Sequence, residues 1–150
     1  MRKIYIVYAG NMKEDYFKQA VQEYIKRLSA EFKIDNIEIK EEYSLEKEAD
    51  KILERLEKLG RVYKIVLDRE GTRLTSEKFA ELLYSERVIN AQSAAFIIGS
   101  SHGLSDRVKQ AADFRLSFSD MTFPHSLFRV MLTEQIYRAY MIENNRAYHK

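Results

Sequence analysis

The sequence predicts an α/β fold built on a mainly parallel sheet of five to six strands, with helices on both faces. Two runs, residues 62–67 (VYKIVL) and 94–98 (AAFII), are apolar nearly throughout, which is typical of strands buried on both faces of a parallel sheet. Strand-like runs alternate with amphipathic helical segments along the chain. Because the 150 residues contain no internal repeat, low-complexity tract or linker, we expect one domain spanning residues 1–150.

The first half of the chain is expected to hold two strands and two helices. Two β-rich runs predict the strands: residues 3–8 and 32–39. Asn11 and Glu14 have the spacing of a capping box, which predicts that a helix starts between the strands. Ser44 is expected to cap the second helix and Gly60 to end it.

The second half continues the alternation of strands and helices. A charged loop at residues 68–72 follows the strand at 62–67, and residues 99–103 form a loop after the strand at 94–98. Residues 114–118 are expected to be the last strand. Hydroxyl side chains are expected to start the two intervening helices: Thr75 or Ser76, and Ser105.

The final helical segment is apolar around most of its circumference. The apolar residues are Leu127, Phe128, Val130, Met131, Leu132, Ile136, Tyr137, Ala139, Tyr140, Met141 and Ile142. Such a helix has to be buried on more than one side. In a chain this small the second side is best covered by another subunit, so the pattern predicts a homodimer with two-fold symmetry.

Composition excludes several classes of protein. The chain has no cysteine, hence no disulfide framework, thiolate metal site or thiol nucleophile. No apolar run approaches the roughly 18 residues of a membrane span, and the first residues lack the features of a signal peptide. A cytoplasmic bacterial-type enzyme is therefore expected. The net charge of +2 indicates an RNA partner only weakly.

The short motifs leave their chemistry open when taken alone. The loop from Gly99 to Gly103 lacks the lysine of a phosphate-binding P-loop and the spacing of a dinucleotide fingerprint, so backbone geometry explains its glycines as well as a ligand does. The three histidines, His102, His125 and His149, show no metal-binding spacing. A hydrolase triad of Ser119, Asp120 and His125 is not favoured, because no nucleophile elbow is present.

Two further stretches are candidates for ligand contacts. Residues 116–125 (LSFSDMTFPH) lead from a strand end to Pro124, which is expected at the first position of the final helix. Loops of this kind hold ligands in α/β proteins. The tail at residues 146–150 combines cations with an aromatic ring and an imidazole, which suits a nucleotide, although chain ends are commonly idle.

A close resemblance to a known family runs over the whole chain and is carried chiefly by three stretches: FIIGSSHGLSDRV (96–108), LSFSDMTFPHSLFRVMLTEQIYRAYMI (116–142) and AYHK (147–150). They resemble the ribosomal large-subunit methyltransferase H family. These small SPOUT-class enzymes transfer a methyl group from S-adenosylmethionine to N3 of a pseudouridine in 23S ribosomal RNA. One departure is Ser100, where the family usually has a second glycine; its small side chain is expected to preserve the loop.

The resemblance implies a C-terminal trefoil knot, a homodimer, and action on assembled ribosomes without a metal. It places the S-adenosylmethionine contacts on eight residues: Leu67, Gly99, Phe118, Ser119, Asp120, Met121, Thr122 and Phe123. Arg138, Tyr148 and His149 are the candidates for binding the target nucleotide, with His149 as a candidate base. We expect the tail of one subunit to close over the donor held by the other.

Methyl transfer to a ring nitrogen is a direct displacement, so catalysis rests on alignment and on removing the N3 proton. The absence of cysteine suits methylation at nitrogen rather than at a pyrimidine carbon. Two alternatives are a non-catalytic ribosome- or RNA-binding α/β module and a small nucleotide-binding protein that uses the Gly99 loop. Four cations are candidate phosphate contacts, or else ordinary surface charge: Arg107, Lys109, Arg115 and Arg129.

Overall fold

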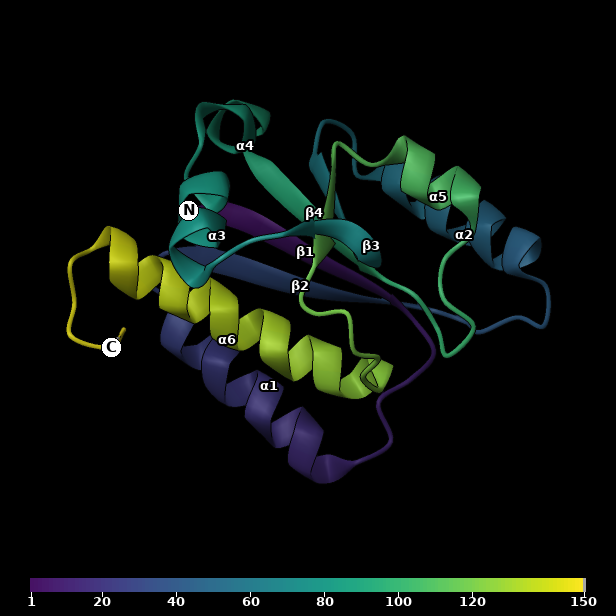
Figure 1. The fold of residues 1–150 in the computed structure, drawn as a ribbon, viewed down its shortest axis with the longest axis horizontal. Helices are drawn as coiled ribbons and strands as arrows, with labels where there is room; N and C mark the ends of the chain where they lie inside the picture. Colours follow the sequence, from purple (N-terminus) through teal and green to yellow (C-terminus); the bar gives the residue numbers. More distant parts are fainter. Residues whose placement is uncertain (150) are drawn as a thin grey trace.

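The structure, a computed structural model, describes residues 1–149 and is built on one five-stranded parallel sheet of order β2-β1-β4-β3-β5 (Figure 1). All four strand pairings are parallel, which confirms the predicted sheet. The elements are β1 (Arg2–Ala9), α1 (Asp15–Leu28), β2 (Phe32–Ile39), α2 (Leu45–Lys58), β3 (Tyr63–Arg73), α3 (Ser76–Leu83), α4 (Glu86–Ala91), β4 (Ser93–Ile98), α5 (Asp106–Ala111), β5 (Phe114–Ser117) and α6 (His125–Glu143). Lys150, the end of the AYHK stretch, lies outside the described residues.

The central strands are buried on both faces. Ile65 packs with α1, α3 and α6 on one face of the sheet, whereas its neighbour Val66 packs with α2 and α5 on the other. Phe96 and Ile97 of β4 divide between the two faces in the same way. Figure 1 shows α1 and α6 side by side below the sheet, and α2 and α5 above it. The continuous apolar runs thus correspond to a sheet covered by helices on both sides.

Most of the predicted helix caps are confirmed. The side chains of Ser44, Thr75 and Ser105 each accept a hydrogen bond from a backbone N–H in the first turn of the helix that follows. Gly60 has a φ of +73° directly after α2, the left-handed conformation that commonly ends a helix.

Two predicted helix starts were wrong, by a few residues at Asn11 and by one residue at Pro124. Asn11 does not open α1, which begins at Asp15 after an N-cap at Glu14 that makes no side-chain capping bond. Met12 is 6% exposed, and its burial keeps this segment against the body of the protein until Glu14. Pro124 precedes α6 instead of occupying its first position, because its ψ of 142° is extended rather than helical.

Strand β3 contacts β5 at two places. Residues 68–72, expected as a loop, belong to β3, and Leu116 of β5 is in register with both Leu67 and Thr72. Between them Gly71 approaches the β5 backbone so closely that a Cβ there would lie 2.5 Å from the carbonyl oxygen of Arg115. The extension of β3 therefore lies tightly against β5, and only glycine fits at that contact.

Helix α6 lies between α1 and α3. Leu132, Ile136 and Ala139 are fully buried in the core. The apolar residues on its remaining faces are only half-buried within this chain: Leu127, Val130, Met131, Tyr137 and Met141. None of the helices within residues 1–149 is both long and apolar enough to cross a bilayer.

Candidate active site

A cavity of about 680 Å³ opens at the ends of β4 and β5 and beside residues 67–70 of β3. This edge, beyond the carboxyl ends of parallel strands, is where open α/β sheets bind ligands. Seven of the eight predicted donor-binding residues line the cavity: Leu67, Gly99, Phe118, Ser119, Met121, Thr122 and Phe123. Asp120 does not line it and instead forms an exposed ion pair of 2.7 Å with Arg73.

The loop after β5 is shaped by its own hydrogen bonds and by one aromatic residue of α6. The Ser119 hydroxyl accepts a hydrogen bond from the backbone N–H of Met121 at 3.0 Å, which forms a tight turn. The ring of Phe128 lies 5.9 Å from that of Phe118 and 5.6 Å from that of Phe123. Phe128 therefore holds both ends of the loop against the start of α6.

The loop after β4 is compact because of Gly99. A Cβ at this position would lie 2.5 Å from the carbonyl oxygen of Gly103 and 2.9 Å from the side chain of Leu104. Ser100 fits without strain, since Gly103 rather than Ser100 takes a positive φ, of +83°. The Ser100 hydroxyl also accepts a hydrogen bond from the His102 backbone at 3.4 Å. Serine in place of glycine thus leaves the loop intact.

Asp68 is the buried charge on the cavity wall. Arg115 donates to its carboxylate at 2.8 and 2.5 Å, Lys109 lies 3.7 Å away, and the backbone N–H of Glu70 adds a third hydrogen bond. Burial alone raises the pKa of Asp68, but the Arg115 hydrogen bond and the other partners outweigh it and hold this pKa below its usual value. The carboxylate therefore stays charged and ties β3 to β5.

The four cations considered as phosphate contacts all have partners within the chain. Lys109 and Arg115 share Asp68, and Arg107 pairs with Glu46 and Asp50. Arg129 is 6% exposed, with its guanidinium 3.7 Å from the centre of the Tyr8 ring. Arg129 therefore fits neither alternative, phosphate contact or ordinary surface charge, because its side chain fills the space between α6 and the sheet.

The predicted nucleotide-binding residues form a second cluster, outside the cavity. Glu134 of α6 accepts hydrogen bonds from Arg138 at 2.6 and 3.0 Å and from the Tyr148 hydroxyl at 3.2 Å. The Arg138 guanidinium lies 4.8 Å from the centre of the Tyr148 ring and 3.2 Å from Nδ1 of His149. Glu77 of α3 lies 2.5 Å from Nε2 of His149. The tail is thus held against α6 and α3 of its own chain.

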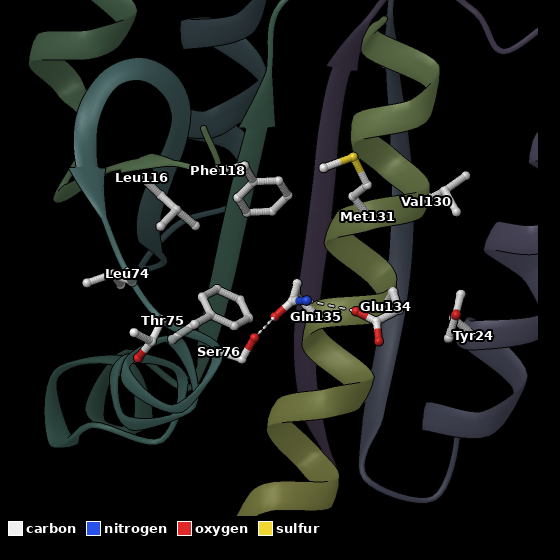
Figure 2. A pocket seen from close by; sticks show the side chains of 11 residues that line it. Tyr24, Leu74, Thr75, Ser76, Leu116, Phe118, Val130, Met131, Glu134 and Gln135 are labelled. Atoms are coloured by element: carbon white, nitrogen blue, oxygen red, sulfur yellow. Dashed lines mark hydrogen bonds between the residues drawn. The ribbon is translucent and has the colours of Figure 1, made fainter. Parts of the chain in front are cut away.

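A groove of about 360 Å³ runs between α3 and α6 next to this cluster (Figure 2). Figure 2 shows Ser76 of α3 facing Gln135 of α6, where the serine hydroxyl donates a hydrogen bond of 2.8 Å to the amide oxygen. Val130 and Met131 supply apolar surface from α6. Leu116 and Phe118 line both the groove and the larger cavity, so the two hollows meet at the end of β5.

Comparison with known proteins assigns the chain to a family. The family model described as "Predicted SPOUT methyltransferase" matches residues 2–149. Proteins named ribosomal RNA large subunit methyltransferase H are 50% identical in Caldicellulosiruptor bescii and 47% identical in Caldicellulosiruptor saccharolyticus, each match covering 98% of this chain and 99% of the relative. A protein of that name, numbered 1, in Clostridium perfringens is 43% identical over the same shares. The chain belongs to the SPOUT methyltransferase family.

Solved structures with a similar arrangement carry far less sequence similarity. The A. aeolicus TrmH/SpoU tRNA modifying enzyme is 15% identical with a TM-score of 0.48, over 93% of this chain and 77% of its own. The SpoU methyltransferase AviRb from Streptomyces viridochromogenes is 10% identical with a TM-score of 0.48, over 95% of this chain and 61% of its own.

The family model and the relatives named methyltransferase H confirm the predicted resemblance, and they show that the chain is an enzyme. They favour the catalytic interpretation over a non-catalytic binding module or a small nucleotide-binding protein. The SPOUT fold implies the C-terminal knot.

Within residues 1–149 of this SPOUT methyltransferase, neither a hydrolase triad at His125 nor a metal-binding cluster is assembled. The Ser119 hydroxyl bonds the Met121 backbone and Asp120 pairs with Arg73, so the two do not form a hydrolase triad with His125. Among residues 1–149 no three histidine or acidic side chains are grouped to hold a metal ion.

Two carboxylates of the cluster, Glu134 and Glu77, were not among the residues predicted from the sequence. The contact of Glu134 with Arg138 could have been predicted, because Glu134 stands four residues before Arg138 on a helix, which is the spacing of a side-chain ion pair. The contact of Glu77 with His149 leaves no pattern in the sequence, since 72 residues separate the two.

Proposed function

We propose that this protein transfers a methyl group from S-adenosylmethionine to N3 of a pseudouridine in 23S ribosomal RNA, acting in the cytoplasm on assembled ribosomes. The observation that carries the proposal is the cavity at the ends of β4 and β5 and beside β3, lined by residues predicted to hold the donor, in a chain of the SPOUT methyltransferase family. Relatives that match over nearly their full length bear the name of a large-subunit ribosomal RNA methyltransferase, which supports the substrate class.

The residues of the cavity fit S-adenosylmethionine. Leu67, Leu104 and Phe118 offer apolar surface for a purine ring. The close approach of Gly99 to Gly103 keeps side chains out of the turn, so that backbone groups can reach a ligand. A volume of about 680 Å³ suits a ligand of this size. When bound there, S-adenosylmethionine supplies a methyl group on a positively charged sulfur.

We further propose that two copies associate through α6 to complete the site. The half-buried apolar residues of α6 and the groove beside them support this, since they need a covering surface. Phe128, on the cavity, and Arg138, in the second cluster, stand ten residues apart on α6, or about 15 Å along its axis. Antiparallel pairing of two α6 helices about a two-fold axis midway between them would bring the Arg138 cluster of one protomer to the cavity of the other.

In such a composite site, different residues of the chain align the methyl group, bind the target nucleotide and accept its proton. The walls of the cavity fix the direction of the methyl group, which is the main requirement of a direct displacement. Arg138 and Tyr148 bind the target nucleotide, and His149 accepts the proton from N3. Burial, together with the neighbouring Tyr24 hydroxyl and Glu134 carboxylate, raises the pKa of Tyr148 to about 12, so its hydroxyl remains a hydrogen-bond donor at neutral pH.

Methyl transfer from labelled S-adenosylmethionine to whole ribosomes, with mass mapping of the modified nucleotide, tests the activity. We expect one methyl group on a pseudouridine of 23S ribosomal RNA. Incorporation into protein, or none at all, would overturn the proposal. A chain ending after Asn145 tests the role of the tail: it should bind S-adenosylmethionine normally but lose methyl transfer, and a normal rate would exclude the tail from the site.

A further inference from the structure

The His149 imidazole is held by two groups of opposite charge. Its Nε2 lies 2.5 Å from a carboxylate oxygen of Glu77 on α3, and its Nδ1 lies 3.2 Å from Nη1 of Arg138 on α6. Helix α3 is itself fixed to α6 beside this contact, because the Ser76 hydroxyl donates to Gln135 at 2.8 Å. The Glu77 carboxylate therefore comes from a framework that is docked independently of the tail.

These contacts determine which ring nitrogen of His149 carries a proton. A guanidinium has only N–H donors, so Nδ1 accepts from Arg138 and has no hydrogen of its own. The proton is then on Nε2, which donates to Glu77. A hydrogen bond to one imidazole nitrogen fixes the orientation and the state of the other. Nδ1 is thus the nitrogen presented as a proton acceptor.

Building on the proposed methyl transfer, we infer that Glu77 is a positioning residue that holds His149 with Nδ1 directed to the substrate. The N3–H of the target base takes the place of the Arg138 N–H as donor to Nδ1. The N3 proton passes to Nδ1, the N3 electron pair forms the bond to the methyl carbon, and the carbon–sulfur bond breaks with its electron pair left on sulfur. The resulting imidazolium keeps its Nε2–H on Glu77, whose negative charge stabilises it.

The charge balance of the cluster supports this division of roles. The hydrogen bond from His149 is the main reason that the pKa of Glu77 lies below its usual value, so Glu77 remains a carboxylate. Glu134 neutralises Arg138 at 2.6 Å, which leaves Glu77 as the carboxylate in contact with the imidazole. Tyr148 also belongs to the cluster, and because burial raises its pKa to about 12, it stays uncharged near neutral pH.

The variants Glu77→Ala and Glu77→Gln test the inference, with Glu81→Gln as the matched control. Glu81 lies one turn further along α3 and is an exposed carboxylate paired only with Lys78 at 2.9 Å among its described ion pairs. We expect Glu77→Ala to lower the rate at saturating ribosome and S-adenosylmethionine by roughly 10- to 100-fold. Glu77→Gln should fall between Glu77→Ala and the wild type, since an amide oxygen still accepts the bond without the charge. Glu81→Gln should match the wild type.

A double-mutant cycle separates positioning from a structural effect. In the His149→Ala background, Glu77→Ala should cost less than about twofold more, because the residue acts through the imidazole. The dissociation constant for S-adenosylmethionine should not change in any of these variants. An unchanged rate in Glu77→Ala, or an equally large loss in the His149→Ala background, would overturn the inference. Wild-type protein that methylates no ribosomal RNA would overturn the proposed function instead, so the two failures are distinguishable.

Discussion

Replacing Gly99 by alanine should weaken donor binding by crowding the loop after β4. The added Cβ would lie 2.5 Å from the Gly103 carbonyl oxygen, whereas ordinary contact begins at 3.4 Å, so one side has to move by about 0.9 Å. Gly103 and Leu104 both line the cavity. A gap of this size forfeits a quarter to a half of each van der Waals contact that it opens.

The expected cost has two parts. Overpacking of this kind lowers the free energy of unfolding by about 1–3 kcal/mol. Displacement of the cavity wall should raise the dissociation constant for S-adenosylmethionine roughly tenfold, which corresponds to about 1.4 kcal/mol. Isothermal titration calorimetry measures the affinity, and urea denaturation measures the stability.

Gly60→Ala provides the control. Gly60 has a φ of +73°, and a Cβ added to it would have no atom within 4 Å, so its substitution strains the backbone without crowding any neighbour. It should reduce stability by about 1 kcal/mol and leave donor affinity unchanged. If the Gly99→Ala protein bound S-adenosylmethionine as tightly as the Gly60→Ala protein, the assignment of this loop to the donor site would be refuted.

Three further changes test other parts of the structure. Asp68→Asn should lower the free energy of unfolding at pH 7 by about 1–3 kcal/mol. Because the pKa of Asp68 is lowered in the folded state, this difference should begin to shrink below about pH 4, the usual pKa of an aspartate, and disappear as the pH falls through the lower folded-state pKa, which urea denaturation over a series of pH values measures. Met131→Asp puts a charge in the groove and should weaken dimerisation roughly 100-fold in sedimentation experiments; an unchanged association constant would exclude this face of α6. Tyr148→Phe removes the hydrogen bond to Glu134 and should slow methyl transfer about tenfold with donor affinity intact; equal rates would remove the hydroxyl from the site.

The sheet could be predicted from the sequence because its central strands have no polar face to satisfy. Residues 62–67 and 94–98 are apolar nearly throughout, and their alternate side chains do pack on opposite faces. The caps at Ser44 and Ser105 depend on contacts within one turn and were equally accessible. The capping box at Asn11 was wrong because burial of Met12, a contact with the body of the fold, outweighed the local signal.

The same difference between local and distant contacts decides which parts of the candidate site could be predicted from the sequence. The loop from Phe118 to Phe123 was located by its sequence position between a strand and a helix, and the structure places most of it on the cavity. The continuation of β3 through Gly71 was missed, since it depends on β5, more than 40 residues later. A charged stretch such as 68–72 has the composition of a loop, and its pairing with β5, together with the ion pair between Asp68 and Arg115, makes it part of the sheet.

In the proposed dimer, the end of β5 would link donor binding to association of the protomers. Phe118 lines both the donor cavity and the groove beside α6, and its ring packs on Phe128 at the start of that helix. A ligand that fixes Phe118 from the cavity side also fixes part of the wall of the groove. Coupling of this kind is reciprocal, so whatever factor S-adenosylmethionine adds to the dimerisation constant, dimerisation must add to donor affinity. The loop at residues 118–123, which precedes α6, is therefore the element that would couple donor binding in one protomer to its association with the other.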